Sequence, residues 1–331
     1  MHLLDKVAQA KEPIVVGNLD GTNAQFFPGT DALATDVAQC PLRYVLHDDV
    51  TKLCTELAFE DDTLLGSSIE LLRVPAPKLW IEFVESARHN VFSNLGLLND
   101  KAASSSHQRV GLFITSDERG RNGYVEVCWE NGDGLSPDVA PFVIEYNFDD
   151  EFFSKSGFVA NDDACIGIDV GNIQSLNPLF RHIRFRLRTQ WHRYYKEKAG
   201  SDIRYRELML LLINPLLEDV PFFAMFCLLL MSKNALRQQA GDRSRLNRSR
   251  ERRGRSPLLD HIELTMNLAP FESVPGDATN AELRASPRIH FVRGHLVRRG
   301  NAIFWRTSHM RGKPEIGSIR SRTISLHIAT G

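Results

Sequence analysis

The chain has 331 residues, of which 43% are hydrophobic and 24% charged, and its formal net charge is −1. This length allows about two domains, and the composition excludes a collagenous or strongly disordered chain. The near-zero charge hides an asymmetry: residues 1–180 carry 12 Lys and Arg against 28 Asp and Glu, whereas residues 181–331 carry 28 against 13. Either the two halves neutralise each other, or the basic half meets nucleic acid or an acidic protein surface.

The first half of the chain predicts an antiparallel sheet with one buried face. Residues 79–84 predict a strand with Leu79, Ile81 and Phe83 on one face, residues 110–114 and 125–129 alternate on either side of a turn-rich segment, and residues 142–148 alternate again. We therefore expect residues 1–172 to form an acidic β-rich domain.

Residues 174–240 predict helices. Apolar residues recur at helical spacing from Leu176 through Phe180, Ile183 and Leu187 to Trp191. The apolar run 220–231 has 12 residues, whereas a bilayer-spanning helix takes about 20, so a buried core helix is favoured over a membrane hairpin. The N-terminus lacks the apolar stretch of a signal peptide, which predicts a cytoplasmic protein without a membrane partner.

The segment 243–255 holds seven arginines in 13 residues, with only Asp242 and Glu251 as nearby acids. Asp242 could cap a short helix that Gly254 and Pro257 would end. On such a helix Arg245, Arg248 and Arg252 share one face, and the planar guanidinium matches phosphate oxygens. One interpretation is contact with an RNA or DNA backbone; the other is a solvated segment, or one docked on the acidic half. The candidate nucleic-acid-binding residues are Arg243, Arg245, Arg248, Arg252, Arg293, Arg298 and Arg306.

Residues 289–298 and 302–306 flank Arg299-Gly300-Asn301, a tight turn signal, and predict a C-terminal β-hairpin. His290 and His295 are five residues apart, so a regular strand would place them on opposite faces. A shared metal is therefore not favoured, and five scattered cysteines form no C-x-x-C pair. We expect no metal and no other cofactor. Acid–base catalysis on RNA by His290, His295 or His309 stays open as an alternative.

The run His290-Phe291-Val292-Arg293-Gly294-His295, followed by the aromatic hairpin with Trp305 and a β-strand tail, resembles the C-terminal end of a phage-encoded anti-CRISPR family. That family acts against the type V-A CRISPR effector nuclease, and a wider set of uncharacterised phage proteins shares the motif. The resemblance covers about 40 residues. Leu296-Val297 stands where the family has aromatic residues after the second histidine, and the first half of the chain matches no motif of it.

The resemblance implies a non-enzymatic inhibitor that recognises the effector's nascent chain and lowers its message and protein. It maps onto His290, Arg293, Gly294 and His295, with Trp305 in the following hairpin. The expected partners are then a protein target, such as a CRISPR effector or its nascent chain, and RNA or the ribosome in a bacterial host. A non-catalytic structural or regulatory phage protein, without nucleic-acid contact, is the other alternative.

For the fold we expect the α+β class, with an antiparallel β-rich N-terminal region, a helical middle and a C-terminal β-hairpin region. Residues 173–331 would form a basic domain of helices and the hairpin. No internal repeat is apparent, and the common nucleotide-binding, hydrolase and metalloprotease motifs do not occur.

Overall fold

The computed structural model describes residues 1–10, 15–16, 25–26, 30–60, 62–97, 107–131, 137–155, 165–167, 177–232, 235–267, 288–292, 295–299, 302–306, 309–311 and 313–318. The chain divides into two compact units. The larger unit comprises residues 1–231 and 236–266, and the smaller one comprises 232–235 and 267–331.

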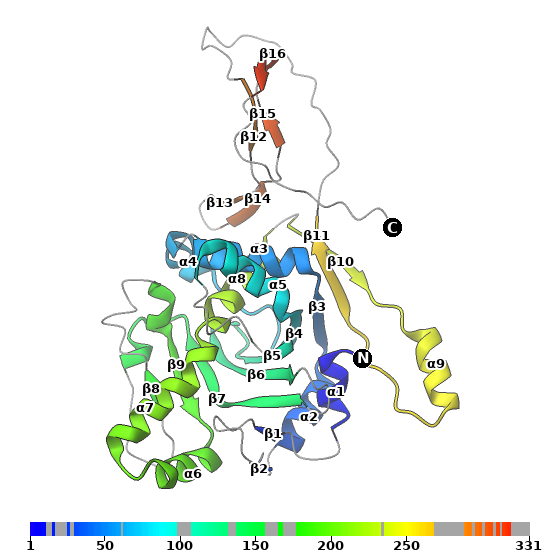
Figure 1. Ribbon diagram of the computed structural model, residues 1–331. Helices are drawn as coiled ribbons and strands as arrows, with labels where there is room; N and C mark the ends of the chain where they lie inside the picture. The colour runs from blue at the N-terminus through cyan, green and yellow to red at the C-terminus, as the bar shows by residue number, and fades with distance from the viewer. Residues whose placement is uncertain are drawn as a thin grey trace. The chain divides into compact units, whose positions relative to one another are not determined.

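The larger unit is built on an 11-stranded mixed sheet (Figure 1). Strands follow one another in the order β10-β11-β3-β4-β5-β6-β7-β1-β2, and β9 pairs with β7 and β8. β3 is parallel to β4 and β11, whereas β4 to β7 run antiparallel. The strands are β1 (Val15–Val16), β2 (Gln25–Phe26), β3 (Leu42–Leu46), β4 (Lys78–Val84), β5 (His107–Ser116), β6 (Asn122–Asn131), β7 (Pro137–Asn147), β8 (Cys165–Gly167), β9 (Ile183–Leu187), β10 (Leu236–Ala240) and β11 (Ile262–Met266).

Helices connect and cover these strands. The α-helices are α1 (Leu3–Ala8), α2 (Thr30–Gln39), α3 (Asp48–Glu60), α4 (Asp62–Ser68), α5 (Glu85–Leu95), α6 (Thr189–Ala199), α7 (Asp202–Ile213), α8 (Asp219–Met231) and α9 (Ser244–Arg252). Short 3₁₀ helices are η1 (Ile69–Leu71), η2 (Phe153–Lys155), η3 (Pro178–His182) and η4 (Asn214–Leu216). Figure 1 shows α3, α5 and α8 gathered on one side of the central strands.

That side of the sheet is apolar. Side chains alternate across a strand, so Leu79, Ile81 and Phe83 of β4 point to one face, and all three are fully buried. Phe222 of α8 packs on Phe83 with ring centroids 4.3 Å apart. The first half of α8 is almost wholly apolar, as expected for a helix enclosed by α3 and the sheet.

The opposite face carries α1 and α2 and mixes apolar with charged residues. Leu4 of α1 and Val37 of α2 pack with Trp80 and Phe113 in one buried cluster. A side chain at Gly111 would overlap the Trp80 ring, because a Cβ there would lie 2.4 Å from Trp80 Cζ2. Close packing of the indole on β5 therefore requires glycine.

Glu82 of β4 is a buried carboxylate on this mixed face, and it positions α1. It accepts hydrogen bonds from the Leu3 and Leu4 backbone N–H groups, both at 2.9 Å, and from Arg109 at 2.9 Å. Burial alone would raise the pKa of Glu82, but the bonds from His2 and Leu4 and the charge of Arg109 outweigh it and hold the pKa below its usual range. The ionised carboxylate thus fixes the start of α1 on the sheet.

The smaller unit contains short strands. β12 (Arg288–Val292) pairs with β15 (His309–Arg311) and β16 (Lys313–Ser318), and β13 (His295–Arg299) forms an antiparallel hairpin with β14 (Ala302–Arg306). The predicted C-terminal hairpin is therefore confirmed.

The α+β class is confirmed, and so are the predicted strands at 79–84, 110–114, 125–129 and 142–148. The helix predicted from Leu176 to Trp191 is wrong over most of its length, because residues 178–182 form η3, 183–187 form β9, and α6 begins only at Thr189. In β9 the apolar residues at every second position, Ile183, Phe185 and Leu187, are buried, and a two-residue period is that of a β-strand.

The predicted domain boundary near 172 lies outside the described residues, yet strands on its two sides share a sheet. β7 pairs with β9 from Phe142↔Leu187 to Tyr146↔Ile183. By length and composition, the helical stretch Asp202–Met231 could cross a membrane, but 61% of its most apolar window is buried in the fold.

Candidate nucleic-acid interface

The arginine-rich segment forms helix α9, inserted between the paired strands β10 and β11. The Asp242 carboxylate accepts a hydrogen bond from the Ser244 backbone N–H at 2.9 Å, which satisfies one of the open donors at the start of the helix. Gly254, with φ of +66°, follows the last turn in a left-handed conformation. The predicted helix forms and Gly254 follows its end as expected, but its N-cap is Arg243, which forms no side-chain cap bond, and Asp242 lies one residue before it.

One side of α9 is docked on the segment that follows it and on α1. The Asn247 carboxamide donates to the Leu258 carbonyl at 2.9 Å and accepts from the Leu258 N–H at 2.8 Å. Arg250 Nε donates to the Ser256 carbonyl at 2.8 Å, and Arg243 Nη1 lies 3.5 Å from Asp5 Oδ2. Arg243, predicted as a nucleic-acid contact, is thus only 13% exposed at its side chain and belongs to the docked side.

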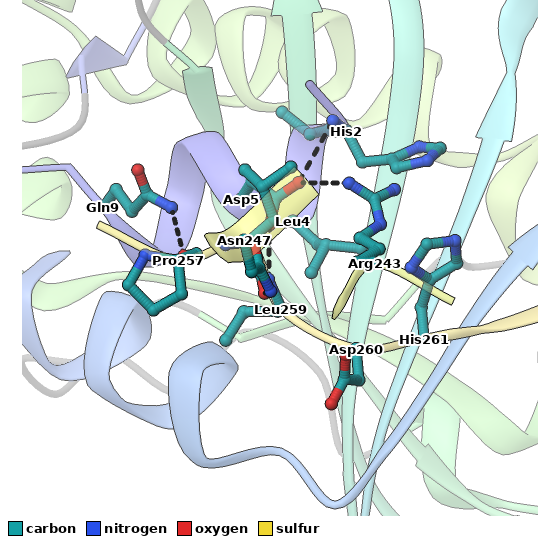
Figure 2. A network of polar contacts seen from close by, with 12 residues as sticks. His2, Leu4, Asp5, Gln9, Arg243, Asn247, Pro257, Leu259, Asp260 and His261 are labelled. Atoms are coloured by element: carbon teal, nitrogen blue, oxygen red, sulfur yellow. Dashed lines mark hydrogen bonds and ion pairs between the residues drawn. The ribbon is translucent and has the colours of Figure 1, made fainter. Parts of the chain in front are cut away.

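Helix α1 anchors this docked side, as Figure 2 shows. The buried Asp5 carboxylate accepts a hydrogen bond from the Leu259 N–H at 2.8 Å, and the Gln9 side chain donates to the Pro257 carbonyl at 3.0 Å. Because Glu82 fixes the start of α1, a chain of bonds links α9 to the centre of the sheet.

The other side of α9 presents Arg245, Arg248 and Arg252, all exposed. At about 3.6 residues per turn these three positions fall within one narrow sector, opposite Asn247. We call these three side chains the Arg face. Among the described residues, none of the three forms an ion pair with a carboxylate, although the charge of Arg248 contributes to lowering the pKa of Asp242.

A pocket of about 550 Å³ lies at the foot of α9. The end of β10, the first turn of α9 and the start of β11 line it; the lining residues include Gly241, Asp242, Arg243, Ser244, Asp260 and His261. It is more open to solvent than enclosed.

His261 is the unusual residue of this pocket. It is 4% exposed, and its Nε2 lies 3.6 Å from the Glu263 carboxylate, slightly beyond hydrogen-bonding distance. Its ring meets the edge of His2 with centroids 4.8 Å apart. Burial, and then the charges of Arg243 and His2, lower the pKa of His261, so the imidazole is neutral at pH 7. Sequence reasoning missed this residue, because Arg243 and His2, whose charges act on it, lie about 20 and 260 positions away in the chain.

In the smaller unit, the structure separates the predicted histidines. His290 lies in β12 opposite Arg311, whereas His295 begins β13 opposite Arg306 in a different sheet. Arg298 and Arg306 are exposed on the hairpin, and Trp305 is half-buried opposite Leu296. The predicted residues Arg293 and Gly294 lie outside the described residues.

A second charged cluster is buried between α5 and α8. Arg88 donates to Glu85 at 2.9 Å and to Asp219 at 2.5 Å, and it lies over the Phe83 ring at 5.2 Å. Burial raises the pKa of Asp219 to about 6 although Arg88 opposes this shift. The Arg88 guanidinium lies between these carboxylates, so the cluster is an internal ion-pair network. Within the described part of the chain, no group of three or more His, Cys, Asp or Glu residues could hold a metal.

Comparison of the chain with models of protein families, with curated proteins and with solved structures finds no match.

Proposed function

We propose that the protein binds single-stranded nucleic acid, RNA foremost, through the Arg face of α9, and that it does so without chemical turnover. The observation that carries the proposal is the two-sided character of α9: three polar anchors hold one side, while three arginines without carboxylate partners among the described residues stand on the other. Folding alone gives no reason for that second side.

The physical case rests on charge and preorganisation. Arginine forks bond phosphate oxygens bidentately, and a docked helix has already lost the freedom that binding would otherwise cost. Arg245 and Arg252 are seven residues apart, which spans roughly 10 Å along a helix axis. The face is therefore long enough for neighbouring phosphates of one strand.

The test is binding of the full chain to unstructured RNA and DNA oligonucleotides over a salt series. Three phosphate contacts on a single strand predict a slope of log K against log salt concentration of about −2. The variant Arg245→Ala/Arg248→Ala/Arg252→Ala should abolish most of this slope. The matched control is Arg119→Ala/Arg181→Ala/Arg204→Ala, which removes the same charge from exposed positions on other elements.

If the two triple variants lose affinity equally, the binding is diffuse and the Arg face is not the site. No binding of any oligonucleotide at about 50 mM salt contradicts the proposal, because phosphate contacts are strongest there. Gels of the same mixtures address the enzymatic alternative. If the wild-type protein shortens the RNA and the His295→Ala protein leaves it intact, catalysis is favoured over binding.

We further propose the anti-CRISPR-type setting that the C-terminal resemblance implies, with a protein target beside the nucleic acid. It is supported by a formed hairpin, β13–β14, where the resemblance expects one with Trp305. Co-expression with a type V-A effector tests it: the effector's protein level should fall. An unchanged level would leave nucleic-acid binding standing and remove this setting.

A further inference from the structure

We propose that a second copy of this chain packs on helix α7, so that two α7 helices form a twofold-symmetric, antiparallel pair in a homodimer. This inference is independent of the proposed function. It starts from the solvent side of α7, where Ile203, Leu210 and Leu211 are 74%, 58% and 57% exposed. Single exposed apolar residues are ordinary, whereas three on one short helix form a patch of the kind that marks an interface.

Helix α7 carries two apolar sides, although a surface helix ordinarily has one. Figure 1 shows α6 and α7 together at the periphery of the larger unit. The inner side of α7 holds four buried residues, Tyr205, Met209, Leu212 and Ile213. The Tyr205 hydroxyl shares a hydrogen bond of 2.7 Å with His192 of α6, so the inner side is already fixed to the fold. Packing of the inner side therefore does not account for the apolar residues on the outer side.

The outer side is a narrow stripe with charged residues at its middle. At about 3.6 residues per turn, positions 203, 207 and 210 fall within a sector of about 60°. Arg206 and Leu211 flank this sector on opposite sides. Glu207, which lies between Ile203 and Leu210 along the helix axis, is exposed, and so is Arg206.

The order of these residues is complementary to itself. Ile203, Arg206, Glu207 and Leu210 are apolar, basic, acidic and apolar, and their spacing is the same from either end. In an antiparallel pair centred between positions 206 and 207, position 203 lies opposite 210 of the second copy, and 206 lies opposite 207. Each apolar side chain then meets an apolar one, and each carboxylate meets a guanidinium. A twofold interface requires this property, because the same patch must fit itself.

The position of Glu207 favours a second copy over a lipid surface. A helix that lies in a bilayer interface keeps its charged residues on the polar side, away from the acyl chains. Glu207 would instead enter the acyl region together with Ile203 and Leu210, where an ionised carboxylate is costly. In the helix pair the same carboxylate faces Arg206 of the second copy.

The first measurement is sedimentation velocity of the full chain over a concentration series. The 12-residue helix α7 offers less than the roughly 800 Å² per partner of a standard interface, so we expect a weak dimer with a dissociation constant on the order of 10 µM. The sedimentation coefficient should therefore rise from that of a monomer to that of a dimer as the concentration passes through this value.

Exchange of charges tests the geometry of the pair. Glu207→Arg places like charges opposite each other and should weaken dimerisation at least about tenfold. The double variant Arg206→Glu/Glu207→Arg restores the pair with its signs exchanged, so it should recover most of the affinity, as only the antiparallel arrangement predicts. The matched control is Glu197→Arg, an exposed residue of α6 outside the stripe, which should leave dimerisation unchanged.

The apolar part of the interface has its own pair of variants. Leu210→Ser should weaken the dimer, whereas Leu246→Ser, at a position 51% exposed on α9, should not. Thermal unfolding of each variant at low concentration checks that the monomer still folds; if Leu210→Ser does not fold, the exchange of charges decides.

A wild-type chain that stays monomeric at every concentration overturns the proposal, and so does a dimer that survives both Glu207→Arg and Leu210→Ser. Flotation with vesicles of anionic phospholipid is run alongside. A monomer that floats with these vesicles, and loses this binding in Leu210→Ser, would overturn the dimer and assign the stripe to a lipid surface instead.

Discussion

Two groups of arginines in this protein differ in what surrounds them. In β9, Arg184 and Arg186 both pair with Glu145, and at the end of the strand Arg188 pairs with Glu126. In α9, the Arg face has no carboxylate partner among the described residues. Both groups consist of arginines, but those of β9 pair with carboxylates and those of the Arg face do not among the described residues.

The difference teaches where to look for function in a charged protein. Paired arginines on a strand neutralise carboxylates that the sheet half-buries, so the fold explains them. Exposed, unneutralised arginines on a docked helix repel one another and gain little from folding. The fold holds them in place nonetheless, which is why the proposal rests on α9 and not on β9.

The largest expected effect lies at the most enclosed arginine. Arg88→Ala should lower the free energy of unfolding by about 3–5 kcal/mol, because it leaves the buried carboxylates of Glu85 and Asp219 without a counter-charge. Denaturant unfolding measures this loss. Arg88→Met, which keeps the apolar stem over Phe83, separates lost packing from lost charge; a loss below about 1 kcal/mol would show that the cluster is solvated.

The second effect is a pH dependence of stability from Asp219. Burial raises its pKa to about 6 in the folded protein from an ordinary value of 3.8, so the folded state binds more protons between these values. Stability from this group is therefore fully present below about pH 3.8 and falls as pH rises through 6, by on the order of 1–3 kcal/mol. Comparing unfolding of wild type and Asp219→Asn between pH 5 and 7 isolates this contribution; parallel curves would contradict it.

The smallest effect tests the comparison directly. Arg188→Ala should cost about 1–2 kcal/mol, because the Glu126 side chain, 11% exposed, loses its partner while part of the site stays open to water. Each single Arg→Ala change in the Arg face should alter stability by less than about 0.5 kcal/mol. Thermal unfolding should show Arg188→Ala as the more destabilising change, whereas oligonucleotide binding should be weakened more by the changes in the Arg face. An Arg188 variant that loses binding as strongly as the α9 variants would remove the distinction.

The sequence predicts much of the fold, since alternation of apolar residues marks β4, β5, β6 and β7 directly. It also predicts α9, because Asp242, Gly254 and a run of helix-forming arginines are local signals. It fails at β9, where apolar residues at 176, 180, 183 and 187 mimic helical spacing although the local period is two. It also fails at the pocket, since nothing near His261 in the chain indicates that His2 and Arg243 will meet it.

The anchoring of α9 joins the two ends of the larger unit's sequence, so it depends on late contacts in folding. The bond from Leu259 to Asp5 closes 254 residues, and β11 enters the sheet beside β3, with Ile262 opposite Tyr44. Contacts of such high sequence separation form late, because the entropy of closing the loop must be met before they contribute. A chain still emerging from the ribosome has neither Leu259 nor β11 in place, so α9 docks only when synthesis of the larger unit is complete.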